Sequence, residues 1–427
     1  MKKLTAIFLS ILLLLLCGCG SIGEKINKTY NDINSIVSGV SDVVSDVVSG
    51  VVAQTVDTDS IEVYDIVIIK PSAVAVQNGE LAAYKKLTLN QKKLYSIILS
   101  AVENMELRNI NITDYVSGDG FSDSIIAHRA IMCDRPDIFW MPKTISILSV
   151  KGKKTKYLAF RNYGDKNDQK GYYGITKEQK DTMLSQLNSA VDRILLDAAM
   201  CGDDFDRELY LHDYICENVT YDQAAADDME NADRNVSNAY GALVEGKAIC
   251  EGYSRAFQLL CMNCGIPCSV IYGEHDNVSH MWNIVNAGDG LYYLDSTFDD
   301  SAESSTLHIY FNLTKSEILK DHKFDADFVS GKTYSSDDSF NFYSPDCKNT
   351  ALNFYEKKGA YIDEDCSLAI NEIRTQMQNG KNSAELKNRT NLSSKKAFSL
   401  LSRKAITTVI LKYCYRFDDE DIIIAVW

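Results

Sequence analysis

The chain has 427 residues, of which 45% are hydrophobic and 24% are charged, and its formal net charge is −15. This length suits two or three domains, and the composition is typical of a globular protein. The negative charge argues against a nucleic-acid partner, which would require a basic surface, and against electrostatic capture by anionic lipids.

The N-terminus combines positive charge, an apolar run and a cysteine in a fixed order. Met1 is followed by two lysines, residues 6–16 are apolar but too short to span a membrane comfortably, and "LCGCGS" follows at 16–21. This last stretch resembles a bacterial lipobox, with Cys19 as the lipid-bearing residue. The resemblance implies that residues 1–19 are a lipoprotein signal and that a lipid on Cys19 anchors an extracytoplasmic protein to the bacterial cell membrane. The alternative is an ordinary secretory signal.

Residues 20–60 are predicted to be a low-complexity tether. The segment 35–52 repeats Ser, Asp, Gly and Val, and its apolar residues recur with helical spacing. Because valine and glycine are poor helix formers, we expect a spacer with partial helix.

Residues 61–200 are predicted to form an N-terminal α/β region that leads into the next domain. Its elements are a strand at 61–69, a helix at 88–105 that begins at a threonine, a hairpin at 144–160 and a long helix at 177–199. A further helix is expected at 204–217. After residue 330 the chain becomes polar and rich in turns, and 345–427 alternates between strand and helix patterns. This indicates a small C-terminal α/β module, in which no cluster of His, Cys or acidic residues points to chemistry.

The stretch "GKAICEGYSRAF" (246–257) places Cys250 at the start of a helix. Apolar residues recur at helical spacing from Tyr253 to Cys264, and Gly265 with Pro267 ends the pattern. At a helix N-terminus the unpaired backbone N–H groups and the helix dipole favour a thiolate and could also hold an oxyanion. Cys250 is therefore a candidate nucleophile, and the alternative is an inert core cysteine.

A base and an acid follow Cys250 in a predicted β-hairpin. The first strand runs from His280 to about Asn286, the loop is Ala287–Gly290, and the second strand runs from Leu291 to about Thr297. A four-residue loop pairs Asn286 with Leu291 and His280 with Thr297. Asp295 then lies diagonal to His280 on the same face, within side-chain reach. The chain thus supplies Cys, His and Asp in the roles of nucleophile, base and orienting acid.

Three segments around these residues resemble the core motifs of the transglutaminase-like superfamily. They are "GKAICEGYSRAF", "SHMWNIV" and "YYLDSTF", and the helix "YLHDYICENVTYD" (210–222) is similar to the one that leads into that core. The resemblance covers roughly 205–300 and maps Cys250, His280 and Asp295 onto the catalytic triad. Phe298 departs from the pattern, because many members carry Trp there.

The resemblance implies an α+β fold with a papain-like core over 201–330, in which the helix bearing the cysteine packs on an antiparallel sheet bearing the histidine and aspartate. It also implies acyl transfer through a thioester on protein or peptide substrates at the cell envelope, with no cofactor. Members include transglutaminases, peptidases, deamidases and inactive scaffolds. Hydrolysis and transamidation both stay open, and the alternative function is a non-catalytic binding or scaffold protein.

Other candidate residues carry weaker signals. Tyr240 could donate to an oxyanion or could simply be a packed aromatic residue. Cys261, Cys264 and Cys268 in "CMNCGIPC" invite a zinc assignment, but Cys264 falls on the buried stripe and Cys268 starts an apolar strand, so no metal is expected. His275 is predicted to lie in a loop. The remaining histidines have no partner that the sequence identifies; they are His128, His212, His308 and His322.

Cysteine usage leaves the redox state open. Twelve cysteines occur, of which Cys17 and Cys19 belong to the signal. An oxidising compartment would pair many of the others, whereas a reducing habitat would leave them as small core residues. The second interpretation is favoured.

Overall fold

The computed structural model describes most of the chain after residue 50. The described ranges are 51–56, 66–67, 78–106, 108–118, 120–160, 174–288, 290–300, 306–335, 338–417 and 421–427. The lipobox, the tether as far as residue 50 and most of the strand predicted at 61–69 therefore lie outside the described residues. Two compact units divide the chain between Thr350 and Ala351.

The larger unit, which ends at Thr350, contains a five-stranded sheet in the order β1-β4-β5-β3-β2. The pairs β4–β5 and β5–β3 are antiparallel, whereas β1–β4 and β3–β2 are parallel. The strands are β1 (Val51–Val56), β2 (Ile66–Val67), β3 (Asn109–Asn111), β4 (Ile145–Val150) and β5 (Lys156–Ala159). The β4–β5 hairpin confirms the prediction at 144–160. The predicted tether, however, does not extend through β1, where β-branched valines favour a strand.

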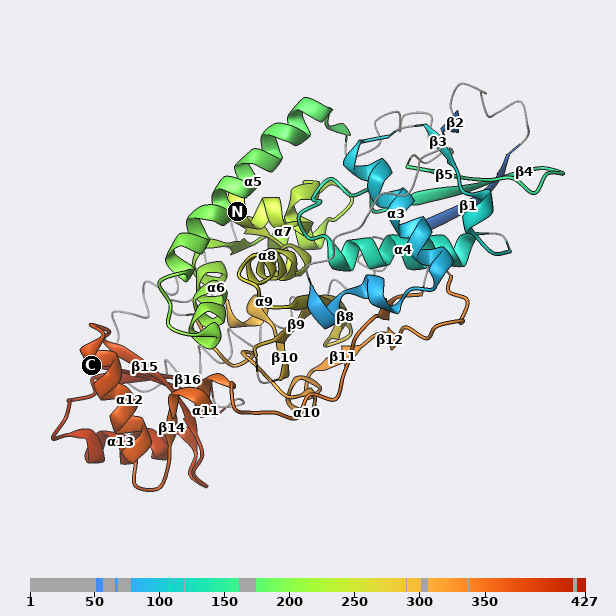
Figure 1. Ribbon diagram of the computed structural model, residues 1–427. Helices are drawn as coiled ribbons and strands as arrows, with labels where there is room; N and C mark the ends of the chain where they lie inside the picture. The colour runs from blue at the N-terminus through green and yellow to red at the C-terminus, as the bar shows by residue number, and fades with distance from the viewer. Residues whose placement is uncertain are drawn as a thin grey trace. The chain divides into compact units, whose positions relative to one another are not determined.

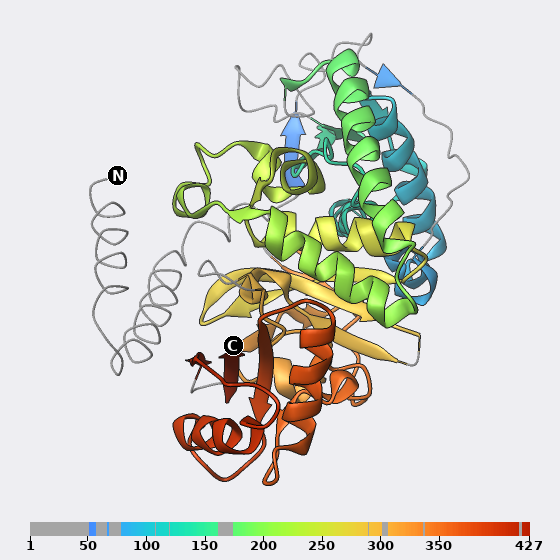
Figure 2. The same cartoon turned by 90° about the vertical axis from the view of Figure 1, so that its left-hand side faces the viewer.

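Helices with clear N-terminal signals accompany this sheet. Thr88 and Thr176 each form a capping box, with Gln91 and Gln179 respectively, which fixes the first turns of α3 and α5. The helices before the cysteine are α3 (Leu89–Glu103), α4 (Phe121–Asp134), α5 (Lys177–Ala198), α6 (Asp204–Asn218) and α7 (Gln223–Asp227). Figures 1 and 2 show α5 as the long green helix. The helices predicted at 88–105, 177–199 and 204–217 are confirmed to within two residues at each end.

A second, four-stranded sheet is antiparallel throughout, in the order β10-β9-β8-β11. Its strands are β8 (Cys268–His275), β9 (Val278–Asn286), β10 (Leu291–Leu294) and β11 (His322–Phe324). Helix α8 (Cys250–Asn263) packs against β8 and β9, as Figure 1 shows. The helix ends at Asn263 with Cys264 as its C-cap, and Gly265 follows with a left-handed φ of 79°, the stop that the sequence predicted. This α+β arrangement, a cysteine-bearing helix on an antiparallel sheet, is the fold class expected from the sequence.

Two hydrogen-bonded side chains fasten α8 to this sheet. Ser254 on α8 donates its hydroxyl to the carbonyl of Met281 at 2.8 Å. Asn283 on β9 donates to the carbonyl of Ser254 at 3.0 Å and to that of Ser269 on β8 at 3.3 Å. These side chains are buried, and each bond therefore satisfies a polar group that water cannot reach.

Short elements complete the larger unit. The strand pairs are β6 (Thr220–Tyr221) with β7 (Lys247–Ala248), and β12 (Ala326–Asp327) with β13 (Phe340–Asn341). The short helices are η4 (Gly79–Leu81), η5 (Ala83–Lys86), η6 (Thr113–Tyr115), η8 (Arg234–Ser237), η9 (Gly241–Glu245), α9 (Ser296–Asp299) and α10 (Lys315–Ile318).

The described part of the smaller unit begins at Ala351 and is an α/β module. Its sheet has the order β14-β15-β17-β16, with a parallel β14–β15 pair and antiparallel pairs elsewhere. The elements are α11 (Phe354–Lys358), β14 (Tyr361–Ile362), α12 (Ser367–Gln378), β15 (Ser383–Asn388), α13 (Ser394–Ala405), β16 (Tyr413–Phe417) and β17 (Ile422–Val426). Within the described ranges, no helix of either unit has the length and apolar character that crossing a membrane requires.

Candidate active site

Cys250 is the first residue of α8, and its side chain lies at the helix N-terminus. Ile249 precedes it in extended conformation, so the N–H groups of the first turn have no partner inside the helix. The close packing of this turn depends on Gly252: a Cβ there would lie 2.5 Å from the carbonyl oxygen of Val236 and 2.6 Å from the Cβ of Ala248. Cys250 is buried, with 8% of its surface exposed.

His280 and Asp295 meet across the second sheet. Nε2 of His280 lies 2.5 Å from Oδ2 of Asp295, and both residues are buried. The other carboxylate oxygen of Asp295 accepts the backbone N–H of Thr297 at 2.9 Å. The Cys250 thiol lies near His280 and, together with Asp295, raises the pKa of the imidazole. Because Nε2 of His280 is engaged by Asp295, Nδ1 is the ring nitrogen left for the thiol.

The β-hairpin differs from the prediction in where its second strand ends. The register is the expected one, since Asn286 pairs with Leu291. The second strand, however, ends at Leu294 rather than near Thr297, so the predicted pairing of His280 with Thr297 is wrong. Asp295 instead caps the N-terminus of α9, as an aspartate followed by short polar residues readily does.

The electrostatics of the three residues favour a charged histidine. Burial opposes charge on His280, but the Asp295 carboxylate and the nearby Cys250 thiol outweigh it and raise the pKa of His280 to about 10. Burial likewise opposes charge on Asp295, yet the neighbouring His280 and His322 hold the pKa of that carboxyl far below its usual range. The arrangement therefore stabilises an imidazolium that can pair with a thiolate.

His322, on β11, is a second histidine on the same carboxylate. Its Nε2 lies 3.0 Å from Oδ2 of Asp295, and its Nδ1 lies 2.6 Å from Oδ1 of Asp321. Burial opposes its charge, but these two hydrogen bonds raise its pKa. No local pattern predicts this role, because His322 reaches the site through the antiparallel pairing of β11 with β8, in which it lies opposite His275.

Aromatic rings surround His280. The ring of Trp282 stacks on it at a centroid distance of 5.9 Å, and Phe298 meets it edge to face at 5.0 Å. Phe298 also lies 4.0 Å from the ring of His275, which is the last residue of β8 and not part of a loop as predicted. Burial, together with the nearby positive charge of His280 and His322, lowers the pKa of His275 to about 4.

Two tyrosines border the site. The predicted oxyanion donor Tyr240 directs its hydroxyl to Oε1 of Gln186 at 2.7 Å, and its ring packs on Phe139 at 5.3 Å. Its part in holding an oxyanion stays a prediction. Tyr221, which the sequence reasoning missed, pairs with Ala248 two residues before Cys250. Burial, together with nearby acidic groups such as Asp295, raises the pKa of Tyr221 well above the usual value.

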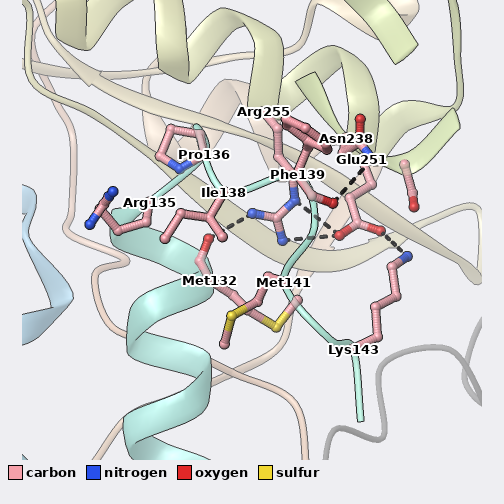
Figure 3. Close-up of a pocket in the computed structure, with 11 residues that line it drawn as sticks. Met132, Arg135, Pro136, Ile138, Phe139, Met141, Lys143, Asn238, Glu251 and Arg255 are labelled. Carbon is pink, nitrogen blue, oxygen red and sulfur yellow. Dashed lines mark hydrogen bonds and ion pairs between the residues drawn. The ribbon is translucent and has the colours of Figure 1, made fainter. Parts of the chain in front are cut away.

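A pocket of about 340 Å³ lies against the Glu251 face of the first turn of α8 (Figure 3). Glu251 forms ion pairs with Lys143 at 2.9 Å and with Arg255 at 3.0 Å. The rest of the lining is largely apolar and includes Met132, Pro136, Ile138, Phe139 and Met141. The pocket and Cys250 thus share one turn of helix.

Three groups of histidine and aspartate among the described residues have ligand atoms within 4.8 Å of one another and could hold a metal ion. They are His212–Asp213–His308, His275–Asp321–His322 and His280–Asp295–His322. The first is a separate network, in which Asp213 lies 3.0 Å from His212 and 2.9 Å from His308. All ten described cysteines are free, including Cys261, Cys264 and Cys268.

Comparisons with known proteins found similarity to solved structures. A crystal structure of a TGase is 21% identical, with a TM-score of 0.26, and the match covers 38% of this chain and 46% of that one. A crystal structure described as a "Putative Cysteine Protease" from Cytophaga hutchinsonii is 14% identical, with a TM-score of 0.22, and the match covers 34% of this chain and 52% of that one. This chain thus spans about half the length of each. No curated protein matches.

The family comparison covers the part of the chain that carries the candidate triad. Residues 196–296 match the model of the transglutaminase-like superfamily. This range includes Cys250, His280 and Asp295. It also includes His275, but Asp321 and His322 lie beyond it. Residues 196–296 are therefore a transglutaminase-like domain.

Proposed function

We propose that this protein is a cysteine-dependent acyl-transfer enzyme that acts on protein or peptide substrates. The proposal rests above all on the contact chain from Cys250 to His280 to Asp295 at the N-terminus of α8. A nucleophile, a base and an orienting acid in this order are what this chemistry requires. The transglutaminase-like domain supports the same class of reaction.

The proposed reaction has two halves. The sulfur of Cys250 attacks the carbonyl carbon of an amide, the C–N bond breaks, and the leaving amine takes a proton from the His280 imidazolium. The product is a thioester on Cys250. Water or a second amine then attacks the thioester and gives a proton to His280, and the Cys250 thiolate leaves. Water as the nucleophile gives a peptidase or amidase, and an amine gives a transglutaminase.

The remaining residues of the site would assist by holding charge. Asp295 keeps the His280 ring oriented through Nε2 and stabilises its protonated form. The N–H groups of the first turn of α8 face the position where the oxyanion forms at Cys250, and we assign them to its stabilisation. Each such donor is worth about 3 kcal/mol in comparable sites.

Selective alkylation tests the proposal. In the full chain near pH 7, Cys250 should react with iodoacetamide at least ~10-fold faster than the other cysteines, because an ordinary thiol is only a few per cent ionised there. Burial raises the pKa of Cys133 and Cys216 to about 12, which keeps both as unreactive thiols. Brief labelling and peptide mapping give the relative rates.

The matched control for this labelling is His280→Ala. Loss of the imidazolium should remove most of the excess rate at Cys250 and leave the rates at the partly exposed Cys201 and Cys414 unchanged. Slow and uniform labelling of all cysteines in the unaltered protein would exclude the enzyme and favour a non-catalytic binding protein.

We further propose that the enzyme works at the cell envelope, held there by a lipid on Cys19. The support is the lipobox "LCGCGS" at 16–21. Cys19→Ser should move the protein from the membrane fraction to the soluble fraction, because one acylated residue supplies the anchor. The neighbouring Cys17→Ser is the control and should stay with the membrane. A Cys19→Ser protein that remains as firmly membrane-bound as before would contradict this location.

A further inference from the structure

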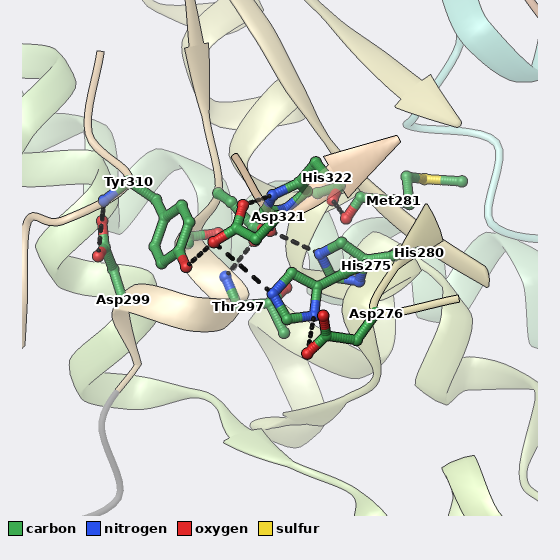
Figure 4. Close-up of polar contacts among 12 residues, drawn as sticks. His275, Asp276, His280, Met281, Thr297, Asp299, Tyr310, Asp321 and His322 are labelled. Atoms are coloured by element: carbon green, nitrogen blue, oxygen red, sulfur yellow. Dashed lines mark hydrogen bonds and ion pairs between the residues drawn. The ribbon is translucent and has the colours of Figure 1, made fainter. Parts of the chain in front are cut away.

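His275, Asp321 and His322 form a compact group near His280 (Figure 4). His275 ends β8, and His322 begins β11 directly opposite it. Their ligand atoms and a carboxylate oxygen of Asp321 lie within 4.8 Å of one another. Two imidazoles and one carboxylate that converge in this way are a donor set that Zn²⁺ accepts, with a fourth position left for water.

His275 is buried, but neither of its ring nitrogens makes a hydrogen bond to a described residue. Its side chain is 7% exposed, yet Nε2 lies 3.9 Å from Oδ2 of Asp321 and Nδ1 lies 3.9 Å from Oδ2 of Asp276. Both distances exceed a hydrogen bond, and no other described residue bonds either ring nitrogen. Packing against Phe298 accounts for the buried ring but not for its two nitrogens. Both ring nitrogens are thus left for solvent or a ligand, because no described residue satisfies either one.

The 3.9 Å gap between His275 and Asp321 is close to the separation of two ligands on one metal ion. Zinc–nitrogen and zinc–oxygen bonds of about 2.0–2.2 Å in tetrahedral geometry hold their donor atoms roughly 3.3–3.5 Å apart. A shift of a few tenths of an ångström would therefore bring Nε2 and Oδ2 into position. Asp321 is 27% exposed at its side chain, which leaves a route from solvent.

The surroundings of both histidines fit metal ligands. Zinc-binding histidines usually have a carboxylate at the other ring nitrogen, which orients the ring. For His322 this is Asp295, 3.0 Å from Nε2. The carboxylate beside His275 is Asp276, whose Oδ2 lies 3.9 Å from Nδ1, beyond hydrogen-bond distance. Asp321 is itself held by the Tyr310 hydroxyl at 2.6 Å.

We propose that His275, Asp321 and His322 bind a zinc ion through Nε2, a carboxylate oxygen and Nδ1 respectively. The ion would take the place of the hydrogen bond between His322 and Asp321, while Nε2–H of His322 continues to donate to Asp295. The site is thereby joined to the proposed triad through one shared carboxylate. Zinc binding is separate from the proposed catalysis and stands even if Cys250 is inert.

Cobalt titration tests the site without reference to activity. The full chain carrying Cys250→Ser, which removes the thiol nearest the group, is titrated with Co²⁺ and then with Zn²⁺. We expect one Co²⁺ per chain with visible d–d absorption, no near-ultraviolet thiolate charge-transfer band, and displacement by Zn²⁺. His275→Ala and the volume-conserving Asp321→Asn should each raise Kd at least ~10-fold, with melting curves confirming that both variants fold.

The matched control is His308→Ala, which alters the other histidine–aspartate network of the same unit. It should leave the cobalt affinity unchanged. The proposal fails if no stoichiometric Co²⁺ binding occurs, if the spectrum shows thiolate ligation, or if His308→Ala weakens binding while His275→Ala does not.

Discussion

Replacing His280 by alanine should slow acylation of Cys250 by about 10⁴-fold, because it removes both the base and the positive charge that pairs with the thiolate. Asp295→Asn should cost less, at about 10²-fold, since the His280 ring keeps a neighbouring side chain at Nε2 but loses the carboxylate that stabilises its charge. The burst of nitrophenol from an aryl acetate measures acylation directly, and mass spectrometry locates the acetyl group on Cys250.

A buried histidine outside the site provides the control for the loss of acylation rate. His308→Ala removes a ring that contacts Asp213 rather than Asp295 and should leave the acylation rate within about twofold. Melting curves of all three variants separate loss of fold from loss of chemistry. A His280→Ala protein that acylates at the unaltered rate would mean that His280, although near Cys250, has no catalytic part.

Glu251→Ala should lower the free energy of unfolding of the larger unit by about 3–5 kcal/mol, because it leaves two partly buried cations without a partner. The side chains of Arg255 and Lys143 are only 7% and 19% exposed. Burial raises the pKa of Glu251, but the charges of Lys143 and Arg255 outweigh it and hold that pKa below its ordinary value. The stabilisation is therefore present at neutral pH and is lost as the pH falls through this lowered pKa.

Urea unfolding, followed by tryptophan fluorescence, measures the effect. The matched control is Glu103→Ala, which removes an ion pair with Arg135 at 3.0 Å, but one in which the glutamate side chain is 42% exposed. Exposed pairs contribute about 0–1 kcal/mol, so this variant should be nearly unchanged. An equal loss of unfolding free energy in the two variants would show that burial does not strengthen the ion pairs of Glu251.

Local signals in the sequence were enough to predict the elements that carry the triad. Thr88 predicted the start of α3, Gly265 predicted the end of α8, and the four-residue loop at Ala287–Gly290 predicted the hairpin register. Each of these signals acts over a few residues, and tertiary packing had no reason to override them. The same local reasoning explains the error at the end of the second hairpin strand, because the capping preference of Asp295 competed with strand extension and prevailed.

Contacts between distant segments were beyond prediction. His322 lies 27 residues after Asp295, and nothing near it in the sequence indicates that β11 will pair with β8. The ion pair of Lys143 with Glu251 joins residues 108 positions apart. The strand β1 was hidden inside a repetitive segment, where valine periodicity fitted a helix as well as a strand. Such features depend on topology, which short-range patterns do not encode.

The hydrogen bonds that fasten α8 to β9 bear on how the site could evolve. Ser254 and Asn283 lie four and three residues from Cys250 and His280, so they fix the nucleophile and the base within one rigid body. Most of the entropic cost of aligning the reacting pair is thus met during folding, before any substrate arrives. The segments around Phe139 and Tyr240 are not held by these hydrogen bonds. Selectivity could therefore diverge through those segments while the chemistry stays preorganised.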